Sequence, residues 1–160
     1  MGEKEEMSDT SVLGSPFEMS LRSLLMLDEL IDIELDEQRI CAIDFIAVYA
    51  ADFNLLDENL HGYGNYRYSE YPARKNLARE ALKLLVLDGT VSFFPNLNGF
   101  TYRISESGHE VCKGLIDSYA EEYRIAVRTV SMNYDISNSK ALLNDINHYT
   151  IRSLQEVYDE

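Results

Sequence analysis

The sequence has little of what most enzymes and membrane proteins need. Its apolar runs are all far shorter than the ~20 residues of a membrane helix, and no secretory signal opens the chain. It has no glycine-rich phosphate loop, no nucleophile elbow and no cysteine/histidine metal spacing. We therefore expect a cytoplasmic protein with no membrane contact, no cofactor, no metal and no catalytic residues of its own.

Cysteine is scarce as well. The only two, Cys41 and Cys112, lie in separate helical, mainly apolar settings. Cysteines with such neighbours are typical of a protein core, whereas a metal site needs clustered ligands. The sequence predicts two reduced core residues and no disulfide.

Basic charge is scarce, and its distribution is uneven. The net charge is −14; residues 1–61 carry three Lys/Arg against fifteen Asp/Glu, and residues 62–160 carry eleven against thirteen. An acidic protein of this kind repels phosphate, so we expect DNA contact only within a larger complex. The one local basic cluster spans residues 66–83. Its members, with one more arginine on a predicted strand, are candidate DNA or partner contacts: Arg67, Arg74, Lys75, Arg79, Lys83 and Arg103.

Hydrophobic residues make up 46% of the 160 residues, enough for a folded core. The pattern predicts a disordered acidic tail over 1–14, a winged-helix-like domain over 15–132 and a helical arm over 133–160.

Two helix starts can be located near the N-terminus. Ser15, Pro16 and Glu18 form an N-cap, a first-turn proline and a capping box for a helix ending near residue 31. Its predicted inner face contains Phe17, Leu21, Leu24 and Leu25. Asp36 caps a second helix that runs to about residue 51. The predicted inner stripe of this second helix contains Ile40, Ile43, Phe45, Ile46, Ala47, Tyr49 and Ala50.

The segment 71–107 has the pattern of a helix followed by a β-hairpin and carries most of the information about the fold. Pro72 begins a helix that Gly89 ends, and two alternating strands follow around residues 90–94 and 99–105. The helix should bury Leu77, Ala78, Ala81, Leu82, Leu84 and Leu85, and the hairpin should bury Val91, Phe93, Phe100, Tyr102 and Ile104. A long helix over 106–132 and a last helix over about 139–157 come next, the latter with Leu154 on its inner face. The predicted fold is mainly α with a small β-hairpin: a winged helix-turn-helix core with long C-terminal helices.

Two polar positions raise the question of catalysis. Asp44 lies beside the apolar stripe of its helix, where an acid more often caps an element or pairs with an arginine. His61 lies in the long connection 52–71, where a hydrolytic centre with Asp52 or Asp57 is conceivable. Nothing in the sequence brings these groups together, so we favour a solvated or hydrogen-bonded histidine.

The same connection is rich in tyrosine. Such residues could stack on bases or line a protein interface, and the acidic charge favours the interface. The residues predicted for a partner interface are His61, Tyr63, Tyr66 and Tyr68.

The basic helix supports a second hypothesis, a winged-helix DNA-binding transcriptional regulator. Its basic side chains and Arg103 would meet phosphates, with Asn76 as the lone base-reading candidate. A solvated helix face with i,i+4 pairs explains the same residues about equally well.

Several short stretches, taken together, resemble a known family. They are Ser15-Pro16-Phe17-Glu18, Leu21-Arg22, Leu25, Leu27-Asp28, Asp44-Phe45, Asn59-Leu60-His61, Arg79-Glu80, Leu84-Leu85, Gly89, Gly99-Phe100-Thr101-Tyr102, Ser105-Glu106, Ser118-Tyr119 and Arg128. At this spacing, over roughly residues 15–132, the chain resembles the small middle component of bacterial ABC-three-component systems, a group that includes the small subunit of Lamassu anti-phage and anti-plasmid complexes.

This resemblance implies a non-catalytic adaptor. Its partners would be an SMC/Rad50-like coiled-coil ATPase and an effector, commonly a nuclease, which would carry out ATP hydrolysis and DNA cutting. The loop after His61 differs from the family pattern, since it reads Gly-Tyr-Gly-Asn-Tyr-Arg-Tyr and not a proline-rich stretch. No loop-specific contact is therefore transferred to this chain.

Overall fold

The computed structural model describes residues 15–97 and 99–159. Within them, six α-helices, one short 3-10 helix and a three-stranded antiparallel sheet form a mainly α fold. The predicted tail over 1–14 lies outside the described residues. No helix of the described ranges is long and apolar enough to cross a membrane.

Both predicted N-terminal caps are confirmed. Helix α2 (Pro16–Glu29) begins after Ser15, whose hydroxyl accepts a hydrogen bond from the Glu18 N–H at 3.1 Å. Helix α3 (Glu37–Val48) begins after Asp36, whose carboxylate accepts from the Arg39 N–H at 2.8 Å. These bonds satisfy backbone donors that the first turn of a helix leaves free.

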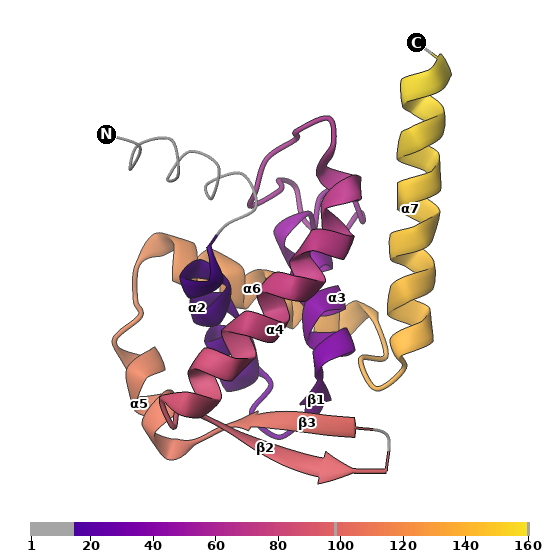
Figure 1. Ribbon diagram of the computed structural model, residues 1–160. Coiled ribbons are helices and arrows are strands. Elements are labelled where there is room, and N and C mark those ends of the chain that lie inside the picture. The colour runs from indigo at the N-terminus through magenta and orange to yellow at the C-terminus, as the bar shows by residue number, and fades with distance from the viewer. Residues whose placement is uncertain (1–14, 98, 160) are drawn as a thin grey trace, which may run out of the picture.

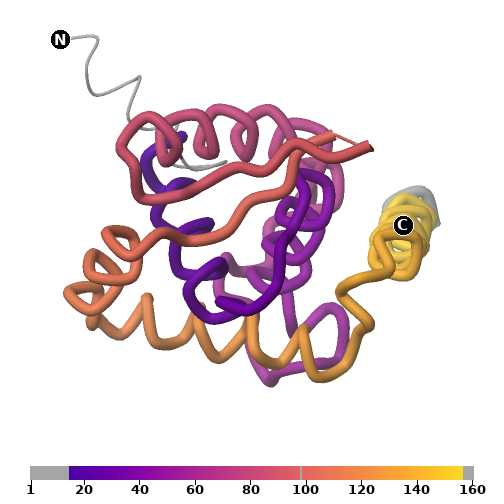
Figure 2. The backbone as a smooth tube through the Cα atoms, turned by 90° about the horizontal axis from the view of Figure 1, so that it is seen from below, coloured from indigo at the N-terminus to yellow at the C-terminus, as the bar shows by residue number. Residues whose placement is uncertain are grey.

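Helix α3 is the centre of the fold. Every residue from Ile40 to Val48 is buried, which confirms the predicted inner stripe and extends it around the helix. Figure 2 shows α4 (Tyr71–Leu87) and α6 (Ser118–Asn133) on opposite sides of α2 and α3. A helix covered all round needs apolar residues all round.

Helix α2 departs from its predicted inner face at one end. Phe17 is 66% exposed, because it lies in the first turn and the buried part of the helix begins at Met19. The core positions of α2 include Leu24 and Leu25, as predicted.

Helix α4 ends as the sequence predicts. Gly89 has φ +76°, a left-handed conformation that glycine adopts without steric cost. Its inner face contains Ala78, Ala81, Leu82 and Leu85. Leu84 is exposed and Arg74 is buried on this face, so both assignments from helical spacing were wrong.

The hairpin pairs β2 (Val91–Asn96) with β3 (Gly99–Ile104), and a third strand, β1 (Leu35–Asp36), pairs with the other edge of β3. The sheet order is β1-β3-β2. Strand β1 was not predicted, since two residues are too few to show an alternating pattern. Figure 1 shows the sheet lying across one end of the helices.

The hairpin does not bury the face that alternation predicts. Val91 is buried at its base, whereas Phe93 and Phe100 are 49% and 51% exposed. These rings and Tyr102 border a shallow groove whose other wall is the end of α4, including Val86 and Leu87. The strands therefore leave a large part of their apolar face uncovered.

The helix predicted over 106–132 is two helices, α5 (Glu106–Lys113) and α6. Gly114 follows the last turn of α5, and the Asp117 carboxylate accepts from the Ala120 N–H at 2.8 Å to begin α6. The apolar periodicity hides this break, because residues on both helices contribute to the same core.

The last helix, α7 (Ser139–Asp159), follows the predicted break at 135–138. Leu142 and Ile146 are buried, and the Tyr149 ring packs on Phe53 at a centroid distance of 4.4 Å. Leu154 is exposed, contrary to its predicted inner position, because the far half of α7 runs past the core (Figure 1).

Candidate functional site

A buried carboxylate, Asp44, lies where four helices meet. Its oxygens accept hydrogen bonds from Arg22 Nε at 2.9 Å, Tyr123 Oη at 2.7 Å and Arg74 Nη1 at 3.3 Å. These donors come from α2, α6 and α4, while Asp44 itself belongs to α3. The interpretation of Asp44 as an arginine-paired residue is confirmed by these contacts.

Arg74 extends the network outward from Asp44. Its Nη2 lies 3.2 Å from Glu70 Oε2, 3.5 Å from Tyr49 Oη and 3.4 Å from His61 Nδ1. The Tyr49 hydroxyl in turn donates to Glu70 Oε2 at 2.6 Å. Two guanidinium groups therefore face two carboxylates, Asp44 and Glu70, and their formal charges cancel.

The network keeps its acid ionised. Burial opposes the charge on Asp44, but Arg22 and Arg74 and the hydrogen bonds outweigh it and lower the pKa of Asp44 below its ordinary value. Burial similarly raises the pKa of the Tyr123 phenol, so it remains a donor. A buried carboxylate with this many partners fixes how the helices are oriented. The ion pairs add little net stability, but removing one partner is costly because it leaves a buried charge uncompensated.

His61 joins this network to the surface. A guanidinium has donors only, so the Arg74 contact assigns Nδ1 of His61 as the acceptor and places the ring proton on Nε2. Nε2 then donates to the Tyr119 hydroxyl at 2.6 Å. Burial, with Arg22 and Arg74 nearby, lowers the pKa of His61 to about 4, so the ring is neutral at pH 7.

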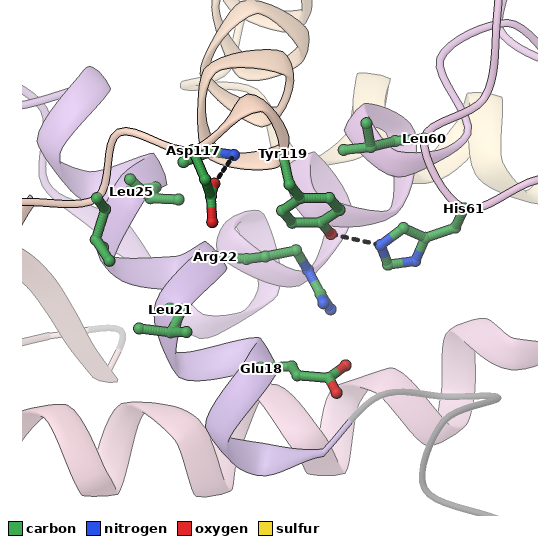
Figure 3. A pocket seen from close by; sticks show the side chains of 10 residues that line it. Glu18, Leu21, Arg22, Leu25, Leu60, His61, Asp117 and Tyr119 are labelled. Carbon is green, nitrogen blue, oxygen red and sulfur yellow. Dashed lines mark hydrogen bonds between the residues drawn. The ribbon is translucent and has the colours of Figure 1, made fainter. Parts of the chain in front are cut away.

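A pocket of about 550 Å³ opens beside this histidine (Figure 3). Its apolar walls consist of Leu21 and Leu25 of α2, Leu60 of the long connection, Leu115 and Ala120. At one side the polar groups of Arg22, His61 and Tyr119 meet, as Figure 3 shows. The carboxylates of Glu18 and Asp117 lie on either side of Arg22 in that view.

A second ion-pair cluster fastens the end of α2. Asp28 pairs with Arg124 at 2.9 Å and is hydrogen-bonded to His109 Nδ1 at 2.5 Å, and Glu29 pairs with Arg128 at 2.7 Å. These contacts tie α2 to α5 and α6, and none of the five residues lines the pocket.

The predicted basic residues do not form one patch. Arg74 is fully buried, so its prediction as a DNA or partner contact was wrong: Asp44 and Glu70 hold it inside the core. The other five have partners on the protein itself. Arg67 pairs with Asp52, Lys75 lies over the Tyr71 ring, Arg79 pairs with Glu37, Lys83 lies 3.6 Å from Glu80, and Arg103 donates to the Ile31 carbonyl.

Of the three tyrosines predicted for a partner interface, two are exposed and one is buried. Tyr66 is largely exposed, and Tyr63 is exposed while donating to Glu58 at 2.7 Å. Tyr68 is buried against Phe45 and stacks on Tyr149, so it belongs to the core and was wrongly placed at the surface.

Two groups of the hypothetical hydrolytic centre, His61 and Asp52, have different partners in the structure. Asp52 pairs with Arg67 and accepts from Asn59, whereas His61 contacts Tyr119 and Arg74. Within the described ranges, no three His, Cys, Asp or Glu side chains gather in a way that could hold a metal ion. Cys41 and Cys112 are free and buried as predicted, and burial raises the pKa of each thiol to about 12.

Sequence reasoning missed the roles of Arg22, Tyr119 and Tyr123. One sequence feature could have found the first: Arg22 and Asp44 are opposite charges, each set in the mainly apolar middle of its helix. Charged residues in such positions are rarely buried unless paired, so they predict each other.

The model of one protein family, ABC-three component (ABC-3C) system Middle Component 2, matches residues 12–156. The chain belongs to this family. The expected middle-component resemblance is thereby confirmed over almost the whole chain, beyond the 15–132 that the short stretches covered. No curated protein and no solved structure matches the chain.

Membership in a three-component system implies that this Middle Component 2 chain has partner components. Five of the stretches that carry the resemblance contribute residues to the pocket lining: Glu18, Leu21-Arg22, Leu25, Leu60-His61 and Tyr119. They come together there although α2, the long connection and α6 lie far apart in the sequence. We therefore take this pocket as the candidate functional site, together with its floor, where Arg22, His61 and Tyr119 connect to the network around Asp44.

Proposed function

We propose that this Middle Component 2 chain is a non-catalytic adaptor in a defence complex of the Lamassu type, directed against phage or plasmids. It holds an SMC/Rad50-like coiled-coil ATPase and an effector, a nuclease, in one assembly. The observation that carries the proposal is the family match over residues 12–156. DNA is contacted only within that assembly.

The surface supports an adaptor role. Phe93, Phe100 and Leu87 expose apolar side chains around the groove between the hairpin and α4, and exposed apolar clusters are typical of protein interfaces. The net charge of −14 favours partners with basic surfaces.

We further propose that α2, α3, α4 and the sheet form a winged helix. The element order α2-β1-α3-α4-β2-β3 and the strand order β1-β3-β2 support this assignment. The hairpin would be the wing, and α4 would be the helix that contacts DNA in DNA-binding members of that fold.

The placement of the basic residues favours the adaptor over a transcriptional regulator. Arg74 is buried, and Arg79 and Lys83 have acidic neighbours on the protein. Fewer free cations remain along α4 than its sequence suggests, and phosphate binding depends on such cations.

Co-expression with the products of the neighbouring genes tests the proposal. We expect a tagged chain to purify in a stable complex with a coiled-coil ATPase and an effector, and the isolated chain to hydrolyse neither ATP nor DNA. A chain that always emerges alone would contradict the adaptor role. Turnover by the isolated chain that is lost in a single-residue variant would contradict its non-catalytic character.

A salt-titrated DNA shift assay tests the regulator. The adaptor proposal predicts no stable complex between the isolated chain and duplex DNA at moderate salt. Tight binding that weakens steeply with salt, and that charge reversal of Arg79 and Lys83 abolishes, would favour the regulator instead.

A further inference from the structure

The pocket between α2, α6 and the long connection has features of a ligand site that the ionic network alone does not explain. Its volume of about 550 Å³ lies within the range of protein ligand pockets. Leu21, Leu25, Leu60 and Leu115 supply apolar walls, so the part of a ligand that enters must be apolar.

The floor offers a hydrogen-bond donor. Because the Tyr119 hydroxyl receives the His61 Nε2 proton, its own proton is left to donate elsewhere. Burial raises the pKa of Tyr119, so that proton is retained at neutral pH. The adjacent Arg22 is neutralised by Asp44, so the floor suits a neutral acceptor such as a backbone carbonyl.

The rim is acidic. Glu18 and Asp117 both line the pocket and both are exposed. Neither carboxylate takes part in an ion pair recorded for the described residues. In a chain of net charge −14, this rim attracts a cationic group and repels an anionic one.

Exposed apolar side chains continue outward from the rim. Phe17 lies one turn before Leu21 on α2, and Ile116, 76% exposed, lies between the lining residues Leu115 and Asp117. A ligand that covers these residues as well as the pocket must be extended, which favours a peptide over a compact small molecule.

We propose that this pocket binds a peptide segment of a partner protein in which a large apolar side chain is flanked by lysine or arginine. The apolar side chain fills the pocket, a backbone carbonyl accepts from Tyr119, and the cationic flank meets Glu18 and Asp117. The identification of this pocket as the docking site for another component rests on the proposed adaptor function. Peptide binding by the isolated chain can be measured whether or not that function is correct.

The test selects a random twelve-residue peptide library against the isolated full-length chain and measures the selected peptides by fluorescence anisotropy. We expect an apolar residue next to Lys or Arg. Leu21→Trp, which fills the pocket, should weaken binding at least about tenfold. Tyr119→Phe, which removes the donor, should weaken it roughly three- to tenfold.

A charge-matched pair of variants tests the rim. In Glu18→Gln/Asp117→Asn both charges are lost while Asn still caps α6, and we expect binding to weaken about threefold or more and to lose much of its salt dependence. Glu106→Gln/Glu121→Gln loses the same charge from first turns outside the pocket and should bind like wild type. Equal weakening by both pairs would overturn the role of the rim.

Other occupants are outcomes that overturn the proposal. These are a library that yields no peptide sensitive to Leu21→Trp, a preference for acidic peptides, and a wild-type dimer that Leu21→Trp makes monomeric. All variants are compared with wild type by thermal unfolding. If Leu21→Trp does not fold, Leu115→Trp, at a half-buried lining residue, is the second variant that fills the pocket, and it should weaken binding to the same degree.

The purified complex separates this proposal from the adaptor role. Release of one component by Leu21→Trp, with the chain still folded, supports both. A complex that forms normally with Leu21→Trp overturns docking at the pocket and leaves the adaptor role intact. If wild type forms no complex, the adaptor role fails, and the peptide measurements still decide whether the pocket binds such a segment.

Discussion

Among single residues, Asp44 has the largest structural consequence. It is fully buried and bonded to Arg22, Arg74 and Tyr123, which come from three different helices. Its carboxylate compensates two buried cations that no water can reach easily. The packing of α2, α3, α4 and α6 against one another therefore depends on contacts to this one side chain.

Replacing Asp44 with asparagine should be severely destabilising. Asp44→Asn keeps the shape but leaves two buried guanidinium groups with too little negative charge, and we expect a loss of about 3–5 kcal/mol in the free energy of unfolding. Urea unfolding measures it. The control is Glu37→Gln, which breaks the exposed Arg79 pair and should cost less than about 1 kcal/mol. Similar losses in the two variants would refute a structural role for the network.

His61 makes stability depend on pH in a defined window. Folding lowers its pKa from 6.5 to about 4, so the unfolded chain binds the proton first as pH falls. Stability should fall by about 1–2 kcal/mol between pH 7 and pH 5 for this reason. The pKa of Asp44 is below its ordinary value, so the loss through that group comes at lower pH.

His61→Gln isolates this effect, since the amide can still accept from Arg74 and donate to Tyr119. We expect a smaller loss of stability between pH 7 and pH 5 than in wild type, measured by urea unfolding at each pH. Parallel curves for the two proteins would show that His61 is not the titrating group.

At the scale of elements, the start of α5 is held against the base of the hairpin. A Cβ at Gly108 would lie 2.1 Å from the Thr90 carbonyl oxygen and 2.7 Å from the Ile104 side chain. The Ser105 hydroxyl also accepts from the Gly108 N–H at 3.1 Å, which begins the helix there. Only glycine allows this close approach of the hairpin base and α5.

Two alanine substitutions distinguish this contact from ordinary helix propensity. Gly108→Ala must displace backbone, and we expect it to cost about 2–3 kcal/mol despite the better helix former. Gly114→Ala meets only an ordinary contact at 3.5 Å and should change stability by less than about 0.5 kcal/mol. Thermal unfolding compares them, and an unaffected Gly108→Ala protein would mean that α5 can move away freely.

For the whole molecule, α7 divides into a docked half and a projecting half. Leu142, Ile146 and Tyr149 pack on the body, whereas Ile151 and Leu154 are exposed. Among the residues of the predicted arm 133–160 whose burial is described, the buried ones therefore lie in its first part.

A chain ending at Ser153 should be as stable as the full chain to within about 1 kcal/mol, because Leu154, Gln155 and Glu156, with which the removed part begins, are exposed. Ile146→Ala should cost about 2–4 kcal/mol, since it leaves a cavity under the docked half. Urea unfolding measures both. A large loss on truncation, with little from Ile146→Ala, would reverse this division of the helix.

Local rules in the sequence were enough for several starts and stops of helices. Ser15, Asp36 and Gly89 act through backbone atoms within a few residues of themselves, so their roles could be predicted without the fold. The core stripe of α3 was equally predictable, because a central helix is apolar whatever covers it.

Tertiary structure alone decided which polar residues are buried and which apolar ones are not. Helical spacing put Arg74 outside and Phe93 inside, but burial depends on which elements pack over a position. The pocket has the same origin: Arg22, His61 and Tyr119 come from separate segments of the chain, and their meeting depends on long-range packing around Asp44. The sequence by itself therefore determined most of the helices, the hairpin and the family, and the tertiary structure decided the site.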